Sequence, residues 1–231
     1  MTCPVTASVD VTLVAPRARV LTKIRCRYEE TQCRRAAHAI WDTDIAGRLN
    51  GVRTDVGSPT ISPMQLVLRP FAIEDEEAAV SAHLALAADG YTNFLLGFQP
   101  GMPWLEWLAH IECSRIGVDL PHDRVRADFL AAEVGGALVG RVSVRFALNE
   151  WLAREGGHIG YAVLPAFRRR GYATEMLRQA VDLAHQGGVG RLLVICDEDN
   201  VGSATVIERC GGMLEGTAVN ENGTAIRRYW V

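Results

Sequence analysis

The sequence predicts a mixed α+β fold, in which about seven strands form a central, mostly antiparallel sheet flanked by about four helices. Two observations carry this prediction. In the middle of the chain, two strand patterns are joined by a Gly-Gly pair, which is typical of an antiparallel hairpin. Later, a strand pattern leads through a helix to a second buried strand, and such a crossover joins parallel strands.

The elements of the first half follow from their apolar periodicity. Residues 65–69 alternate as a short opening strand. Residues 74–89 form an amphipathic helix, whose first-turn acids suit the positive end of the helix dipole. A loop rich in glycine and aromatic residues follows at 89–103. After it come a helix at 104–116 and the hairpin strands 126–134 and 138–148, joined at Gly135 and Gly136.

The second half alternates strands with helices. The run RLLVIC predicts a buried strand, and the pair Gly211-Gly212 ends the last helix. In order, we expect a helical turn at 149–155, a strand at 158–163, a helix at 171–186, a strand at 191–196, a helix at 200–210, and closing strands at 213–219 and 225–231.

Composition excludes several classes of protein. The chain has 231 residues, 48% of them hydrophobic, which is enough for a large core, and its net charge is -3. A dedicated nucleic-acid binder would usually be basic. No apolar run approaches the roughly 20 residues of a membrane span. The first residues also lack the pattern of a secretory signal, so we expect a cytoplasmic protein without nucleic-acid or membrane contact.

The six cysteines include no CxxC pair, which is typical of free thiols in a reducing cytosol. Cys26, Cys33 and His38 lack a fourth ligand at metal-binding spacing. We therefore expect no metal site.

Composition changes near residue 63. Residues 1–63 hold nine basic and six acidic residues, whereas residues 64–231 hold fifteen arginines and twenty-one acids. The junction GSPTISP has the composition of a linker. We expect 1–63 to be an extension that is poorly ordered or, if translation starts at Met64, not part of the native protein. A basic targeting segment is the alternative, and 64–231 is the expected functional domain.

The segment GGHIGYAVLPAFRRRGYA, at 156–173, is the strongest candidate binding site. Its strand runs through a proline-bounded turn and three arginines into a helix that Gly171 opens. The first N–H groups of a helix have no intrahelical acceptor and the dipole is positive there, so this end suits a pyrophosphate. A solvated loop or a nucleic-acid patch is the alternative, but three arginines in an acidic domain favour a phosphate ligand.

Two further motifs accompany this segment. The pattern R-x-x-G-x-A falls on Arg168, Gly171 and Ala173 after YAVLP at 161–165, and DEDNVGSATVIERCGG follows one strand later at 197–212. With this order of elements, the chain resembles the GCN5-related N-acetyltransferase (GNAT) superfamily, and more narrowly a bacterial branch of predicted acetyltransferases with unassigned substrate. The resemblance covers about 64–231 and is strongest from 145 onward.

The resemblance implies acetyl-CoA as the cofactor, bound where two parallel central strands splay apart. Backbone groups of Ala162 and Val163 would pair with the pantetheine arm like an added strand. Asn200 would bind the same arm, unless it only caps a helix. Ser203 would touch the cofactor, unless it is merely exposed. The pyrophosphate would lie against Arg168, Arg169, Arg170, Gly171, Tyr172, Ala173 and Thr174.

The resemblance also implies a tyrosine in the last helix that protonates the leaving thiolate, but that position is Ile207. Tyr172 and Tyr229 are candidates to replace it, and a reaction without an acid is the alternative. His158 is the leading candidate for the general base, because an ordinary pKa near 6.5 suits proton removal. Its alternative is a histidine satisfied by backbone hydrogen bonds.

Other charged residues near this strand supply further candidates for the base and for substrate binding. Glu155 is the next candidate base, with Glu150 beside it. Arg145 and Glu150 are the expected substrate-binding residues, since Arg145 could hold a substrate carboxylate or simply pair with Glu150. Asp197 and Asp199 could bind a cationic substrate or cap the helix that follows them.

These expectations describe an acetyl-CoA-dependent N-acetyltransferase that acts by direct attack of a primary amine of a small molecule or peptide. A covalent route through Cys196 is disfavoured, because this residue looks buried and has no histidine partner in sequence. The acidic balance of 64–231 favours a cationic acceptor. The alternative is a non-catalytic acyl-CoA-binding sensor, which the missing tyrosine keeps open. A homodimer is left open, and the aromatic residues of 91–107 are expected in the core.

Overall fold

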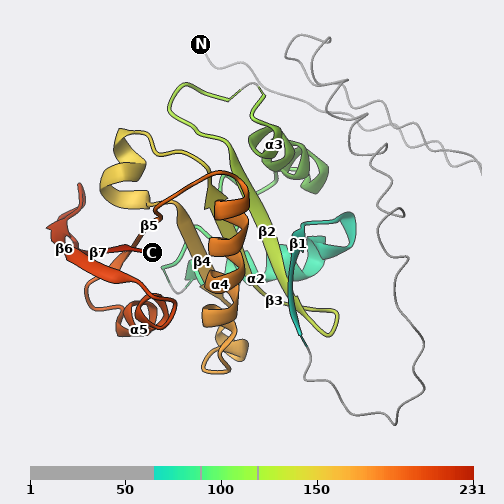
Figure 1. The fold of residues 1–231 in the computed structure, drawn as a ribbon. Helices are drawn as coiled ribbons and strands as arrows, with labels where there is room; N and C mark the ends of the chain where they lie inside the picture. The colour runs from blue at the N-terminus through green and yellow to red at the C-terminus, as the bar shows by residue number, and fades with distance from the viewer. Residues whose placement is uncertain (1–64, 89, 119) are drawn as a thin grey trace, which may run out of the picture. The chain divides into compact units, whose positions relative to one another are not determined.

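A computed structural model describes residues 65–88, 90–118 and 120–231, and Figure 1 shows their arrangement. The extension predicted at 1–63, with Cys26, Cys33 and His38, lies outside the described residues. Among the residues that are described, no helix is both long and apolar enough to span a bilayer.

One sheet of seven strands forms the centre of the described part, in the order β1-β2-β3-β4-β5-β7-β6. Neighbours β4 and β5 pair in parallel, and the other neighbouring pairs are antiparallel. The predicted mixed, mostly antiparallel sheet is therefore confirmed. Its strands are β1 (Leu66–Pro70), β2 (Ala127–Val134), β3 (Ala137–Arg145), β4 (Ile159–Val163), β5 (Leu193–Asp197), β6 (Met213–Val219) and β7 (Ala225–Trp230).

Helices pack on the sheet through two separate hydrophobic clusters. Helices α2 (Glu76–Ala88) and α3 (Trp104–Ile116) contribute to one cluster, together with Phe129 and Ala131 of β2. Helices α4 (Tyr172–Gln186) and α5 (Val201–Arg209) contribute to the other, and Figure 1 shows α4 crossing the sheet beside β4. The aromatic residues Phe94, Trp104 and Trp107 are buried, as expected for core residues. Short helical turns are η2 (Ile73–Asp75), η3 (Leu152–Gly156) and η4 (Pro165–Phe167).

The β2–β3 hairpin turns where the Gly-Gly pair predicted it. Gly135 and Gly136 have φ angles of 58° and 82°, which favour glycine at both positions. Strand β3 ends at Arg145, three residues before the predicted end. The ladder ends there because its partner strands begin at Ala127 and Ile159. In the helical turn that follows, the side-chain oxygen of Asn149 accepts the N–H of Leu152 at 2.8 Å.

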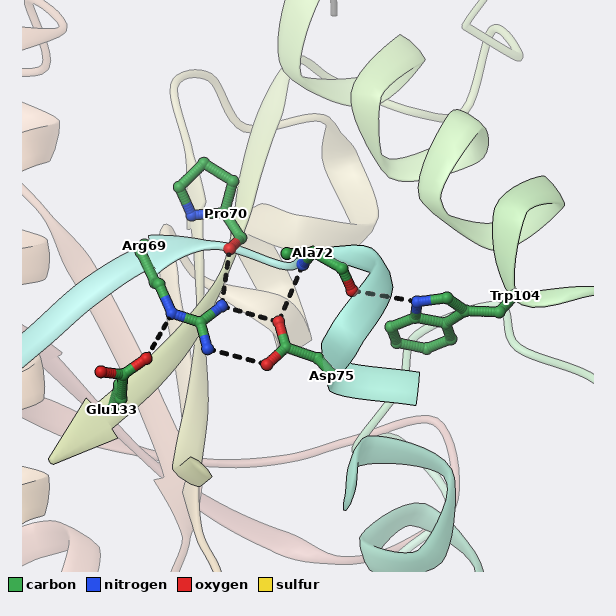
Figure 2. Close-up of polar contacts among 6 residues, drawn as sticks. All are labelled: Arg69, Pro70, Ala72, Asp75, Trp104 and Glu133. Carbon is green, nitrogen blue, oxygen red and sulfur yellow. Dashed lines mark hydrogen bonds and ion pairs between the residues drawn. The ribbon is translucent and has the colours of Figure 1, made fainter. Parts of the chain in front are cut away.

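Polar contacts fix the edge strand β1 to its neighbours, as Figure 2 shows. Arg69 donates to Glu133 of β2 at 2.6 Å and to both carboxylate oxygens of Asp75 at 2.6 and 2.7 Å. The indole of Trp104 donates to the carbonyl of Ala72 at 3.0 Å. This network joins β1, β2, η2 and α3. In it, the positive charge of Arg69 is balanced by the two carboxylates of Asp75 and Glu133.

Candidate active site

The parallel strands β4 and β5 diverge almost from their first residues. Each has five residues, yet the ladder between them holds a single pair, Ile159 with Val194. Strand β4 pairs with β3 along its whole length, and β5 does so with β7. Beyond the single pair, the edges of β4 and β5 that face each other therefore have no partner strand among the described residues. On β4, the backbone of Val163 faces this gap, whereas that of Ala162 faces Arg141 in the ladder with β3.

The N-terminus of α4 lies after the C-terminal end of β4 and is open. Gly171 caps the helix with φ 82°, and a Cβ added there would meet no atom within 4 Å. The first bond of the helix joins the N–H of Glu175 to the carbonyl of Gly171 at 3.2 Å. The N–H groups of Tyr172, Ala173 and Thr174 thus precede the intrahelical ladder, and they provide donors for an anion.

The three arginines of the preceding loop are exposed, and none forms an ion pair with a described residue. Arg169 has φ 64°, the one positive φ of a non-glycine residue in the described ranges. Such a conformation is costly and is concentrated at functional sites. Arg168 donates to the carbonyl of Val163 at 3.3 Å, and Arg170 lies over the Phe167 ring at 5.6 Å. The loop therefore offers positive charge beside the open helix end.

A pair of hydroxyl groups joins β4 to α5. Asn200 caps α5 by accepting the N–H of Ser203 at 2.9 Å, and the hydroxyl of Ser203 lies 2.7 Å from that of Tyr161 on β4. Burial raises the pKa of Tyr161 well above its ordinary value, so the phenol keeps its proton at neutral pH. Sequence reasoning missed Tyr161 as a site residue. Only the alternation of β4 could have indicated it, by placing the ring on the α4 and α5 face.

The other tyrosine candidates lie elsewhere. Tyr229 is fully buried, and its hydroxyl donates to Glu208 at 3.1 Å. Tyr172, the first residue of α4, packs partly buried against the core. Ile207 is fully buried one helical turn after Ser203. Two described phenols therefore reach α5 near this turn, the fully buried Tyr229 at Glu208 and Tyr161 at Ser203.

His158 bridges the start of the two diverging strands. The ring Nδ1 of His158 accepts the backbone N–H of Leu193 at 2.9 Å. The backbone N–H of His158 donates to the carbonyl of Leu193 at 2.7 Å. Burial lowers the pKa of His158, and the charge of Arg145 lowers it further. The neutral ring therefore carries its proton on Nε2. In this arrangement the ring has no free lone pair with which to take a proton from an amine.

The carboxylate candidates lie outside this junction. Glu155 lines an open depression of about 430 Å³ between η3 and the β6–β7 hairpin, and it accepts the N–H of Glu221 at 2.9 Å. Glu150 is exposed. Arg145 donates to the carbonyls of Gly156 and Gly157 at 3.0 and 3.2 Å, and it forms no ion pair with Glu150.

The sequence matches one known family. The family model described as an acetyltransferase (GNAT) domain matches residues 65–213, which is more than half of the chain. The chain therefore belongs to the GNAT acetyltransferase family, as the motifs predicted. No curated protein matches the sequence at a significant level.

Solved structures share the fold at low sequence identity. An acetyltransferase from Agrobacterium tumefaciens str. C58 is 20% identical with a TM-score of 0.50, over 78% of this chain and 98% of that one. RimJ of Mycobacterium smegmatis, in complex with CoA-disulfide, is 18% identical with a TM-score of 0.54, over 72% and 81%. The yncA protein of Salmonella typhimurium, solved with its cofactor acetyl-CoA, is 15% identical with a TM-score of 0.50, over 72% and 92%. At these identities the three proteins support the fold alone.

Proposed function

We propose that the protein is an acetyl-CoA-dependent N-acetyltransferase that acetylates a primary amine of a small molecule or peptide by direct attack. One observation carries the proposal: an open, cationic helix N-terminus lies after a strand that diverges from its parallel neighbour. Membership of the GNAT family supports acetyl transfer as the reaction class.

The residues present fit acetyl-CoA. The N–H groups of Tyr172, Ala173 and Thr174 and the arginines at 168–170 would hold the pyrophosphate, because donors and positive charge meet there in open space. The free edge of β4 at Val163 would pair with the amides of the pantetheine arm. The side-chain N–H₂ of Asn200 donates to no described residue and suits a pantetheine carbonyl. The acetyl-CoA and CoA-disulfide seen with the yncA and RimJ proteins agree with this fit.

Acetyl-CoA supplies an acetyl group already activated as a thioester. Tyr161 would donate its phenolic proton to the departing sulfur, in place of the tyrosine that Ile207 replaces. Ser203, 2.7 Å from the phenolic oxygen, would orient that proton. The raised pKa of Tyr161 keeps the proton on the phenol until negative charge develops nearby.

The amine must lose a proton. Glu155 lies outside the β4–β5 junction, in the depression beside η3, so we propose that it takes this proton through a water molecule. One oxygen of this carboxylate accepts the N–H of Glu221, and the other makes no hydrogen bond with a described residue. His158 becomes a positioning residue, since its Nδ1 holds β5 at the point where the strands separate.

Direct attack is favoured over a covalent cysteine route. Cys196 is buried in β5, and burial raises the pKa of its thiol. A thiol that remains protonated is a poor nucleophile at neutral pH.

A second candidate is an acyl-CoA-binding sensor of the same fold. The fully buried Ile207 favours it, because the usual tyrosine acid is absent. Release of CoA thiol from acetyl-CoA, measured across a panel of amines, separates the two candidates. Amine-dependent release with an acetylated product supports the enzyme, whereas tight CoA binding without turnover on any amine supports the sensor.

A further inference from the structure

A row of three polar side chains lies on one face of β3. Arg141, Ser143 and Arg145 alternate along the strand and therefore point to the same face. Across the ladders, Arg141 stands beside Ala131 of β2 and Ala162 of β4, two residues of the hydrophobic cluster under α2 and α3. The row thus lies in a largely apolar layer.

The positive charges of this row have no carboxylate partner among the described residues. Arg141 is 6% exposed, and its guanidinium donates to the hydroxyls of Tyr91 and Ser143 and to the carbonyl of Asn93. Its Nε is buried and has no hydrogen-bond acceptor among the described residues. Arg145 is partly exposed and donates only to backbone carbonyls.

Arg69 shows what the same fold does with a structural arginine. That guanidinium pairs with two carboxylates, those of Asp75 and Glu133, although it is more exposed (Figure 2). Arg141 and Arg145 have no such partner in the described part of the chain. Burial lowers the pKa of Arg145 to about 10, and the charges of Arg141 and Arg124 contribute, so the row is cationic at neutral pH. A buried charge without a counterion is costly, which makes an anion a favourable addition.

The row also borders the point where β4 and β5 diverge. Gly160 of β4 stands opposite Ser143, one residue after the single β4–β5 pair. A Cβ at Gly160 would lie 3.0 Å from the Ser143 hydroxyl and 3.5 Å from Nη1 of Arg141. A side chain at Gly160 would therefore crowd the polar groups of the row, next to the point where β4 and β5 diverge.

We propose that Arg141, Ser143 and Arg145 bind an anionic group, a carboxylate or a phosphate, that the acceptor amine itself carries. The inference rests on the proposed function and names its substrate class. Two guanidinium groups with a hydroxyl between them match the oxygen atoms of such an anion. The proposal reverses the preference for a cationic acceptor that the acidic composition suggested, because the local charge of the site outweighs the net charge of the domain.

Matched acceptors test the proposal with acetyl-CoA and the full chain. The pairs are common amino acids with their amides, and O-phosphoethanolamine with ethanolamine. For the wild type we expect kcat/KM to be at least about tenfold higher for the anionic member of a pair, the scale of one or two charged hydrogen bonds. The amino acids and phosphoethanolamine distinguish a carboxylate from a phosphate.

Arg145→Met should remove this preference by lowering kcat/KM for the anionic member of each pair, and Arg145→Lys should keep part of the preference. Arg178→Met, on the exposed surface of α4, is the matched control and should behave as wild type. If Arg145→Met fails to fold by circular dichroism, Ser143→Ala takes its place. Equal rates for both members of every pair, or a preference for the neutral or cationic amine, would overturn the proposal.

Thermal unfolding of the CoA-saturated protein gives a readout that does not depend on turnover. The anionic members should raise the wild-type Tm, the neutral members should not, and Arg145→Met should lose the shift. A protein that acetylates amines but shows no preference for anions disproves this inference alone. A protein that is stabilised by anionic amines but acetylates none disproves the proposed enzyme and leaves the anion site in place.

Discussion

The surroundings of Tyr161 suggest that it is the general acid, a role that its position in the sequence did not indicate. Its hydroxyl crosses from β4 to Ser203 on α5, one turn before the buried Ile207. Tyr161→Phe keeps the ring and removes the acid. We expect kcat to fall about a hundredfold, the lower end of what general acids contribute, while the Kd for CoA changes less than about twofold.

Steady-state kinetics with calorimetry of CoA binding check this prediction. Ser203→Ala is the companion variant, and it should lower kcat less because the phenol remains. If Tyr161→Phe turns over at the wild-type rate, the phenol has no role as the acid.

His158 should act on stability rather than on proton transfer. Its pKa in the folded state lies below the ordinary value of about 6.5, so the unfolded chain binds a proton more readily. The stabilisation is present above that value and is lost as the pH falls through the lower folded pKa. Buried His83, whose Nδ1 accepts the N–H of Leu95, contributes in the same direction.

Urea unfolding at pH 8, 7, 6 and 5 measures this loss. The free energy of unfolding should decline below about pH 6.5, and less steeply in His158→Asn than in the wild type. The shape of the pH–rate profile should be unchanged in this variant. Disappearance of the acidic limb of that profile would instead restore His158 as the base.

At the scale of the elements, the β4–β5 junction depends on the glycine before β4. Gly157 has φ 61°, and an added Cβ would lie 2.6 Å from the carbonyl oxygen of Leu193. Gly157→Ala should lower the free energy of unfolding by about 2 kcal/mol or more, from backbone strain plus this contact. Gly136→Ala is the control, since φ is 82° there and no atom lies within 4 Å.

Urea denaturation compares the two variants. Strain alone should cost Gly136→Ala about 1 kcal/mol, and the excess in Gly157→Ala reports the close approach of β4 to β5. Equal losses in the two variants would mean that the junction tolerates a side chain.

The sequence was sufficient to predict the order of the elements, because apolar periodicity and glycine pairs are local signals. Helix α3 was predicted at its observed bounds, and α4 within one residue. The Tyr161–Ser203 pair was missed because it joins residues 42 positions apart, and only packing brings them together. The alternation of Arg141, Ser143 and Arg145 with Val142 and Val144 is typical of a strand with one solvated face. Only tertiary contacts, such as those with Tyr91 and Asn93, make Arg141 a buried charge, and Arg145 stays partly exposed.

At the scale of the whole molecule, we propose that residues 64–231 form an autonomous acetyltransferase domain. The family match begins at residue 65, and the seven strands lie between Leu66 and Trp230. A chain that starts at Met64 should unfold within about 2 °C of the full chain, less than the shift that 1 kcal/mol produces, and bind CoA with the same Kd. A lower Tm or weaker binding, measured by calorimetry, would assign residues 1–63 a role in the domain.

The central claim is that the open N-terminus of α4 binds the pyrophosphate of acetyl-CoA. Gly171→Val tests it, because a β-branched residue is strained at φ 82° and places atoms where the anion would lie. Gly188→Val is the matched control at the other end of α4, since φ is 88° there and no atom lies within 4 Å of an added Cβ.

Calorimetric titration of acetyl-CoA into the wild type and these two variants is the most direct measurement. The account predicts binding that is weaker by at least about tenfold, or about 1.4 kcal/mol, in Gly171→Val, and a Kd within about twofold of wild type in Gly188→Val. An unchanged Kd in a folded Gly171→Val protein would contradict the assignment of this site.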